Sequence, residues 1–316
     1  MKKKTTVKII INVVLIFSIG LLTAQTTESG RFKIKNLSIN TKYSDFGTSF
    51  YGNSHVVFSS PKNNKSLIKT VWKPNKQRYL DLYIGSIDTD GEIIEKQQLL
   101  REINSKYHQA KVVFTKDLRT IYFTGNDSKN TVNLQLFKAS VAADGKWINL
   151  VKLPFNSDQY STGHPALSPD NKKLYFISDR PGTFGKTDIY VVDIHEDGTY
   201  GKPKNLGPKI NTVHNEMFPF ISNDHTLYFS SKGHSSIGGL DIFASKANII
   251  GFSQPVNLGI PVNSEKDDFA FIIDSKKMRG YFSSNREKGK GDDDIYSVKL
   301  LKPIKTESTH LVESRF

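Results

Sequence analysis

Three acidic residues lie at matching positions of the sequence, 13 or 14 residues before the phenylalanine of a recurring aromatic phrase. They are Asp45, Glu216 and Asp268. Carboxylates that converge on one point can bind a cation or a basic segment of a partner protein. Glu216 and Asp268 could also form the carboxyl pair that glycoside cleavage requires. The alternative is that these side chains only close turns, because Asp often bonds backbone groups near it.

A basic stretch between Pro61 and Arg78 is the second candidate surface, and it contains no acidic residue. It includes one large aromatic side chain among its cations, a combination that can serve as a protein hot spot or a glycan contact. An ordinary solvated loop is the alternative. The candidates for partner contact are Lys65, Lys69, Trp72, Lys73, Lys76 and Arg78.

A third set of charged residues recurs at one position of each repeat, and it consists of Asp81, Asp188, Asp241 and Asp294. Such recurrence favours a structural role, in which the carboxylates bond backbone groups or pair with Arg180 and Arg286 of the preceding loops. The run 292–294 offers hard oxygen ligands for Ca²⁺, but no EF-hand pattern surrounds it. We therefore expect no metal site.

Several kinds of enzyme chemistry have no support in the sequence. The chain contains no Cys, which excludes a thiol nucleophile, disulfides and cysteine metal sites. There is no Gly-x-Ser-x-Gly motif for a serine hydrolase. The eight His residues include no His-Glu-x-x-His pair, and His214-Asn215-Glu216 is the nearest arrangement. We expect no catalytic residues, no cofactor and no enzyme activity.

A repeat of 53 residues reveals the elements that must position these side chains. The phrases at 174–176, 227–229 and 280–282 each contain Tyr-Phe, and phrases beginning at Asp188, Asp241 and Asp294 recur at the same interval. Weaker copies at 121–123 and 56–58 bring the number of units to five. A period of this length is typical of propellers.

Each unit contains about four short apolar segments that are separated by turns, with Asp-Gly at 90–91, 144–145 and 197–198. Segments rich in aromatic and β-branched residues suit strands that are covered on both faces. The fifth unit lacks its outer strand, and residues 31–38 could supply it. We predict an all-β, five-bladed β-propeller of four-stranded antiparallel blades, with the last blade closed by the N-terminal strand.

The beginning of the chain has the pattern of a secretory signal peptide. Four lysines precede a continuous apolar or small stretch at 9–22, and Thr23-Ala24 offers a cleavage site. The apolar stretch is too short to span a bilayer comfortably. We predict a signal peptide at 1–24, a leader at 25–30, the propeller at 31–302 and a flexible tail at 303–316. The formal net charge is +13, but export argues against nucleic acid as the partner.

Residues 167–180, with the sequence LSPDNKKLYFISDR, resemble the Pro-Asp variant of WD-repeat-like β-propellers of the TolB type. Residues 39–47 and 79–83 are similar to the propeller region of OmpA-family envelope proteins of gliding, type IX-secreting bacteria. The resemblance covers about residues 31–302. Those relatives usually continue into an OmpA-like domain that binds peptidoglycan; this sequence has no such segment, so that activity is not carried over.

The resemblance implies a periplasmic interaction platform, peripheral to the outer membrane. Its partners would be envelope or secretion-machinery proteins, in association with type IX secretion or gliding. We expect no membrane span after removal of the signal. The alternative is a carbohydrate-active or glycan-binding propeller with its site at the mouth of the channel.

Overall fold

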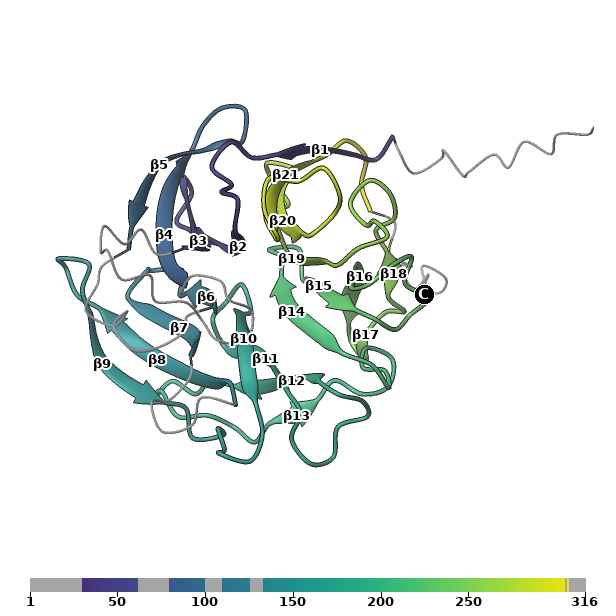
Figure 1. Ribbon diagram of the computed structural model, residues 1–316. Coiled ribbons are helices and arrows are strands. Elements are labelled where there is room, and N and C mark those ends of the chain that lie inside the picture. Colours follow the sequence, from purple (N-terminus) through teal and green to yellow (C-terminus); the bar gives the residue numbers. More distant parts are fainter. Residues whose placement is uncertain (1–29, 62–79, 100–109, 126–132, 305, 307–316) are drawn as a thin grey trace, which may run out of the picture.

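Five small antiparallel sheets stand around one central axis (Figure 1). The computed structural model describes residues 30–61, 80–99, 110–125, 133–304 and 306, and within these ranges it contains strands and turns but no helix. No helix that could cross a membrane occurs in these ranges either. The prediction of an all-β, five-bladed propeller is confirmed.

The blades follow one another in sequence, each running from the axis outward. Blade 1 consists of β2 (Phe46–Tyr51), β3 (His55–Pro61), β4 (Leu80–Ile87) and β5 (Ile93–Gln98). Blade 2 consists of β6 (Ala110–Phe114), β7 (Thr120–Gly125), β8 (Gln135–Val141) and β9 (Trp147–Lys152). Blade 3 consists of β10 (Thr162–Leu167), β11 (Lys173–Ser178), β12 (Asp188–Asp193) and β13 (Lys204–Asn205).

The last two blades have irregular outer edges. Blade 4 consists of β14 (Glu216–Ile221), β15 (Thr226–Ser231) and β16 (Asp241–Asn248), and β16 pairs with both β17 (Gly251–Phe252) and β18 (Val256–Asn257). Blade 5 consists of β19 (Asp268–Asp274), β20 (Arg279–Ser284) and β21 (Asp294–Leu300), completed by β1 (Phe32–Asn36). The pairing of β1 with β21 runs from Phe32 opposite Leu300 to Asn36 opposite Tyr296, so the N-terminal strand closes the ring as predicted.

The apolar segments without strict alternation are strands whose two faces are each covered by a neighbouring blade. Along β11, Leu174 and Phe176 pack into one core cluster, whereas Tyr175 and Ile177 pack into another. Successive side chains of a strand point to opposite faces, so each face of the blade contributes to a different interface. All four side chains are buried.

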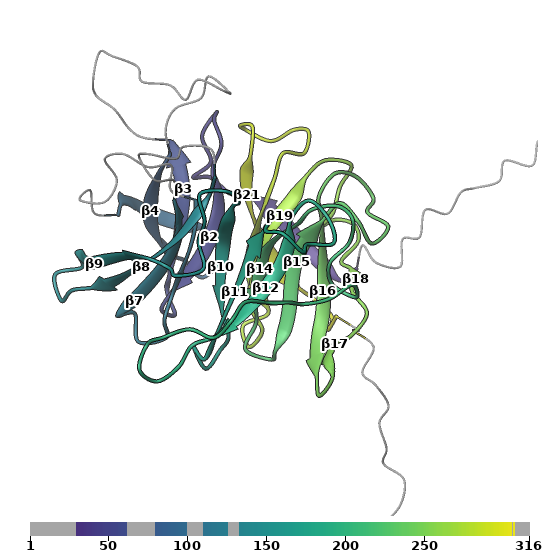
Figure 2. The same ribbon diagram turned by 90° about the horizontal axis from the view of Figure 1, so that it is seen from below.

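The five innermost strands surround the axis, and each contacts the innermost strand of the next blade, including β19 with β2. Seen from the side, these strands run along the axis through the thickness of the ring (Figure 2). Every innermost strand has a shift of register against its neighbour. Such β-bulges bend a strand and redirect a side chain, and here they turn one residue of each strand toward the axis.

Candidate functional site

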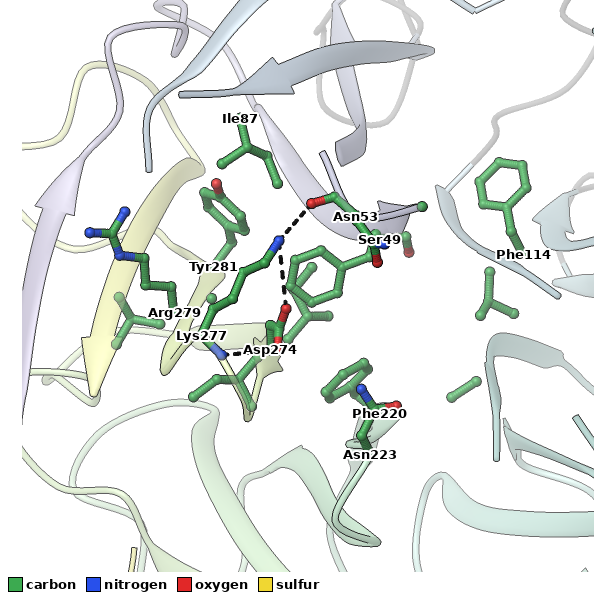
Figure 3. A pocket seen from close by; sticks show the side chains of 18 of the residues that line it. Ser49, Asn53, Ile87, Phe114, Phe220, Asn223, Asp274, Lys277, Arg279 and Tyr281 are labelled. Carbon is green, nitrogen blue, oxygen red and sulfur yellow. Dashed lines mark hydrogen bonds and ion pairs between the residues drawn. The ribbon is translucent and has the colours of Figure 1, made fainter. Parts of the chain in front are cut away.

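One end of the central channel opens into a cavity of about 670 Å³. Its wall is built from the last residues of the innermost strands and from the turns that follow them. Figure 3 shows side chains from four of the blades around this shared space. Residues of the wall include Ser49, Phe50, Asn53, Phe114, Ala166, Asn171, Phe220, Asn223, Asp274 and Tyr281. The volume of the cavity is within the range of roughly 300–1,000 Å³ that is usual for small-molecule sites.

Aromatic rings form much of this wall. Phe50 and Tyr281 meet edge to face with ring centroids 6.4 Å apart. The Tyr281 hydroxyl donates a hydrogen bond of 3.1 Å to the carbonyl oxygen of Gly91, which fixes the ring. Burial raises the pKa of Tyr281, so its hydroxyl remains protonated. Phe220 contributes a half-buried ring from blade 4.

The rim of the cavity carries charged side chains from blade 5. Lys277 Nζ donates a hydrogen bond of 2.7 Å to the carbonyl oxygen of Asn53 and lies 3.8 Å from Asp274 Oδ2 (Figure 3). Arg279 donates a hydrogen bond to the carbonyl oxygen of Thr89. These contacts join the β19–β20 turn to blade 1 and define one side of the opening.

The channel is filled below the cavity by side chains from the bulges of the innermost strands. His164 stacks on Phe218 with centroids 3.9 Å apart, and Phe218 in turn lies 5.0 Å from Phe269. Phe46 contacts Phe269 at 6.0 Å. These four residues, from four different blades, form one aromatic cluster that we call the aromatic plug.

A lysine lies in the same layer as this plug. Lys111 occupies the bulge of β6, lines the cavity and is only 2% exposed. Its Nζ donates a hydrogen bond of 2.8 Å to the carbonyl oxygen of Thr48. Burial lowers the pKa of Lys111 to about 7. Burial together with the charge of Lys111 lowers the pKa of His164 to about 3, so that imidazole is neutral.

The three acidic candidates lie at the other end of the innermost strands, where β2, β14 and β19 begin. Asp45, Glu216 and Asp268 are fully buried, with no exposed area. Their carboxylates accept hydrogen bonds of 2.6–2.8 Å from the backbone amides of Thr41, Thr212 and Ser264, four residues earlier in each case. The structure therefore uses them to hold the turns between blades, and they present no acidic surface.

Asp188, Asp241 and Asp294 bind two separate parts of their blade. In blade 3, Asp188 accepts a hydrogen bond of 2.7 Å from the Phe184 amide and another of 2.7 Å from the side chain of Asn205 on the outer strand. Asp241 and Asp294 make the equivalent pairs of bonds. Asp81 instead accepts from Gln98 at 2.5 Å. The glycine that precedes the repeated Asp is needed because a Cβ at Gly185 would clash with the carbonyl oxygen of Thr212.

Arg180 and Arg286, which were predicted to pair with the repeated Asp residues, contact other groups instead. Arg286 lies 2.6 Å from Asp268 and covers the rings of Phe282 and Tyr296. Arg180 covers the equivalent rings of Phe176 and Tyr190. It donates to the Phe155 carbonyl oxygen at 3.2 Å. Blade 3 has Thr162 where blade 5 has Asp268, so Arg180 has no equivalent carboxylate there.

The basic loop candidates Lys65, Lys69, Trp72, Lys73, Lys76 and Arg78 lie outside the described residues. The cavity itself was missed by sequence reasoning, and Lys111 with it. The signal that could have found Lys111 is the repeat: a charged residue lies inside an apolar strand, at the position that Gly47, His164, Phe218 and Ala270 have in the other blades.

No family model matches this chain, and no match was found among curated proteins. Solved structures share its fold. A β-xylosidase is 13% identical with a TM-score of 0.51, over 85% of this chain and 95% of that one. An exo-β-1,3-galactanase from Clostridium thermocellum is 13% identical with a TM-score of 0.51, over 87% of this chain and 64% of that one. TolB from Acinetobacter baumannii is 14% identical with a TM-score of 0.43, over 81% of this chain and 54% of that one.

The similarity to the β-xylosidase and the galactanase agrees with the fold described above, and TolB is also among the structural neighbours. The chain spans about half of the TolB chain and 30% of a prolyl endopeptidase chain that it also matches. The expectation from the sequence that this protein is not an enzyme is wrong, because it rested only on missing motifs. Glycoside-cleaving proteins have the same architecture, so the lack of familiar catalytic motifs does not exclude enzyme activity.

Proposed function

We propose that this protein binds a glycan in the cavity at the end of its central channel. The observation that carries the proposal is the composition of the wall, which combines aromatic rings with amide and charged side chains around a cavity of about 670 Å³. Sugar rings offer apolar C–H faces and hydroxyl edges, and they need both kinds of partner. Phe50, Phe220 and Tyr281 supply aromatic surface, while Asn53 and Asn223 supply donors and acceptors.

The construction of the cavity supports binding with little rearrangement. Five rigid strands converge on it, and turns that are joined by hydrogen bonds form its rim. A site that is already formed avoids much of the entropy cost of ordering side chains on binding. The β-xylosidase and galactanase named above show that propellers of this architecture can act on glycans, although the likeness concerns the fold alone.

The test is a glycan array followed by calorimetry with the chain from Gln25 onward. Asn53→Ala and Asn223→Ala should each weaken binding about tenfold, as loss of one or two hydrogen bonds implies. Asn248→Ala, at the last residue of β16 and outside the cavity wall, is the matched control and should bind as the parent does. Hydrolysis of each bound glycan is measured in the same samples. Equal binding by all three variants would contradict the location of the site.

The second candidate function is the protein interaction platform in the cell envelope that the family resemblance implies. A specific observation favours it: β9, the outer strand of blade 2, exposes Ile148, Leu150 and Val151 by 45, 42 and 51%. An edge strand with apolar side chains can add a strand from a partner. We propose periplasmic location and envelope or secretion-machinery proteins as partners. Crosslinking in the native envelope with Leu150→Lys as the comparison tests this, and an unchanged set of partners would contradict it.

A further inference from the structure

Lys111 is a buried cation for which the propeller itself gives little reason. Its side chain is 2% exposed and makes one hydrogen bond, to the carbonyl oxygen of Thr48. An ammonium group has three donors, and lysine is almost never fully buried unless it is paired. The ammonium group of Lys111, which lines the cavity, therefore has unused donors.

Two of the three carboxylates of the cavity wall, those of Asp88 and Asp274, have other partners. Asp88 accepts hydrogen bonds from the backbone amides of Asp90 and Glu92. Asp274 accepts from the amides of Lys276 and Lys277 and also pairs with the Lys277 side chain. In the part of the chain that the structure describes, no carboxylate forms an ion pair with Lys111.

The fold does not require a charge at this position. The residues at the same bulge in the other blades are Gly47, His164, Phe218 and Ala270. None of them carries a charge at neutral pH, because burial lowers the pKa of His164 to about 3. An apolar side chain at position 111 would satisfy the packing and avoid the cost of burying an ammonium group.

The opening of the cavity is also basic. Six cationic side chains line it besides Lys111, against three carboxylates. Lys35 is paired with Glu92 and Lys277 with Asp274. No ion pair is found in the described residues for the other four, which are Lys33, Lys116, Arg279 and Lys299. A surface of one sign that narrows into a cavity concentrates ligands of the opposite charge.

We propose that the cavity binds an acidic sugar, and that Lys111 Nζ holds its carboxylate at the inner end while the basic rim attracts it. This rests on the proposed function and specifies its ligand class as a uronate. The Lys111 ammonium donates to the carboxylate oxygens, and the aromatic wall contacts the sugar ring. Binding of the anion returns Lys111, whose pKa burial lowers to about 7, to its charged form.

The experiment compares short galacturonate, glucuronate and mannuronate oligosaccharides with the same compounds after reduction of the carboxyl groups to alcohols. Calorimetry on the parent chain should show at least one uronate bound about tenfold or more tightly than its reduced form. Lys111→Met, which keeps the length and removes the charge, should abolish that difference. Lys111→Arg should retain part of it, since a donor cation remains.

The outcomes are distinct. Equal affinity for uronates and reduced oligosaccharides in the parent chain overturns the acidic ligand but leaves glycan binding intact. Absence of any glycan binding overturns both. If Lys111→Met still binds uronates more tightly than their reduced forms, the role of Lys111 is overturned. If sulfated oligosaccharides bind as tightly as uronates, the assignment of the ligand as a carboxylate is overturned. Thermal melting of each variant shows whether it is folded, and Lys111→Met should be at least as stable as the parent because it removes a buried charge.

Discussion

The side-chain amide of Asn36 donates a hydrogen bond of 2.7 Å to Asp294 Oδ2, across 258 positions of the chain. The same bond joins Asn205 to Asp188 in blade 3 and Asn257 to Asp241 in blade 4, also at 2.7 Å. The N-terminal strand therefore takes the place of an ordinary outer strand, down to the side chain that the repeated Asp requires.

Substitution of Asn36 should reveal what this bond contributes to ring closure. We expect Asn36→Ala to lower the free energy of unfolding by about 1–2 kcal/mol, because Asp294 is buried and loses a donor. Asn205→Ala, which breaks the equivalent bond within a continuous blade, is the matched control and should cost a similar amount. Urea denaturation measures both. No effect of Asn36→Ala beside a normal effect of Asn205→Ala would contradict the equivalence of the two strands.

Arg286 and Arg180 provide a natural comparison for the value of one buried ion pair. Arg286→Met leaves the carboxylate of Asp268 buried without its cation, and should cost about 3–5 kcal/mol. Arg180→Met loses similar ring contacts but no ion pair, and should cost about 1–2 kcal/mol. The double variant Arg286→Met, Asp268→Asn should recover part of the loss. Denaturation near neutral pH gives the three values, and equal costs at both arginines would refute the importance of the pair.

Lys111 should make stability depend on pH in a defined direction. Its pKa is about 7 in the folded protein, against roughly 10.4 in an unfolded chain. Below pH 7 both states carry the proton, and the folded state bears the full cost of the buried charge. Between the two values the unfolded chain binds one more proton, so the free energy of unfolding rises with pH.

Lys111→Met should therefore stabilise the protein by about 3–5 kcal/mol near pH 6, with the advantage shrinking toward pH 10. Lys202→Met, at an exposed lysine, should change stability little at any pH. Chemical denaturation over this range measures the difference. A pH-independent effect of Lys111→Met would show that the ammonium is not buried in the way described.

Asp293 should show the behaviour of a carboxyl group whose charge is disfavoured. Burial, with smaller contributions from Asp292, Asp267 and Asp294, raises its pKa to about 6. The folded protein then binds more protons than the unfolded chain between pH 4 and 6, so stability falls as pH rises through this window. Asp293→Asn should stabilise by about 2 kcal/mol near pH 7 and have little effect near pH 4. Thermal melting at the two pH values decides between this result and a constant difference.

The architecture was predictable from the sequence because the repeat is local and redundant. Most copies place Tyr-Phe on the second strand of the blade and an Asp at the start of the third, so several weak signals reinforce one another. The missing outer strand of blade 5 could be deduced in the same way, since a sheet edge that is left open is a liability. Its partner was recognisable from composition at residues 31–38.

The candidate site was not predictable, because the sequence alone does not show which residues of different blades line one shared cavity. Phe50, Lys111, Phe220 and Tyr281 come from four blades and meet only where the strands converge. Asp45, Glu216 and Asp268 do share a pattern, and the reason is structural: each carboxylate holds the turn that enters its blade. In this chain the periodic acidic residues build the scaffold, whereas the cavity wall combines Tyr281, a member of the repeat, with Lys111, which departs from it.

The pairing of β1 with β21 also determines when the ring can close during synthesis of the chain. During synthesis β1 is made first and β21 last, and the intervening chain takes roughly 13–50 s at usual rates of elongation. Throughout that interval the first strand has no partner, and the fifth blade has an open edge until the final strand is complete. Ring closure is therefore the last event of folding, and the residues of β1 are the last of the propeller to become protected from solvent exchange.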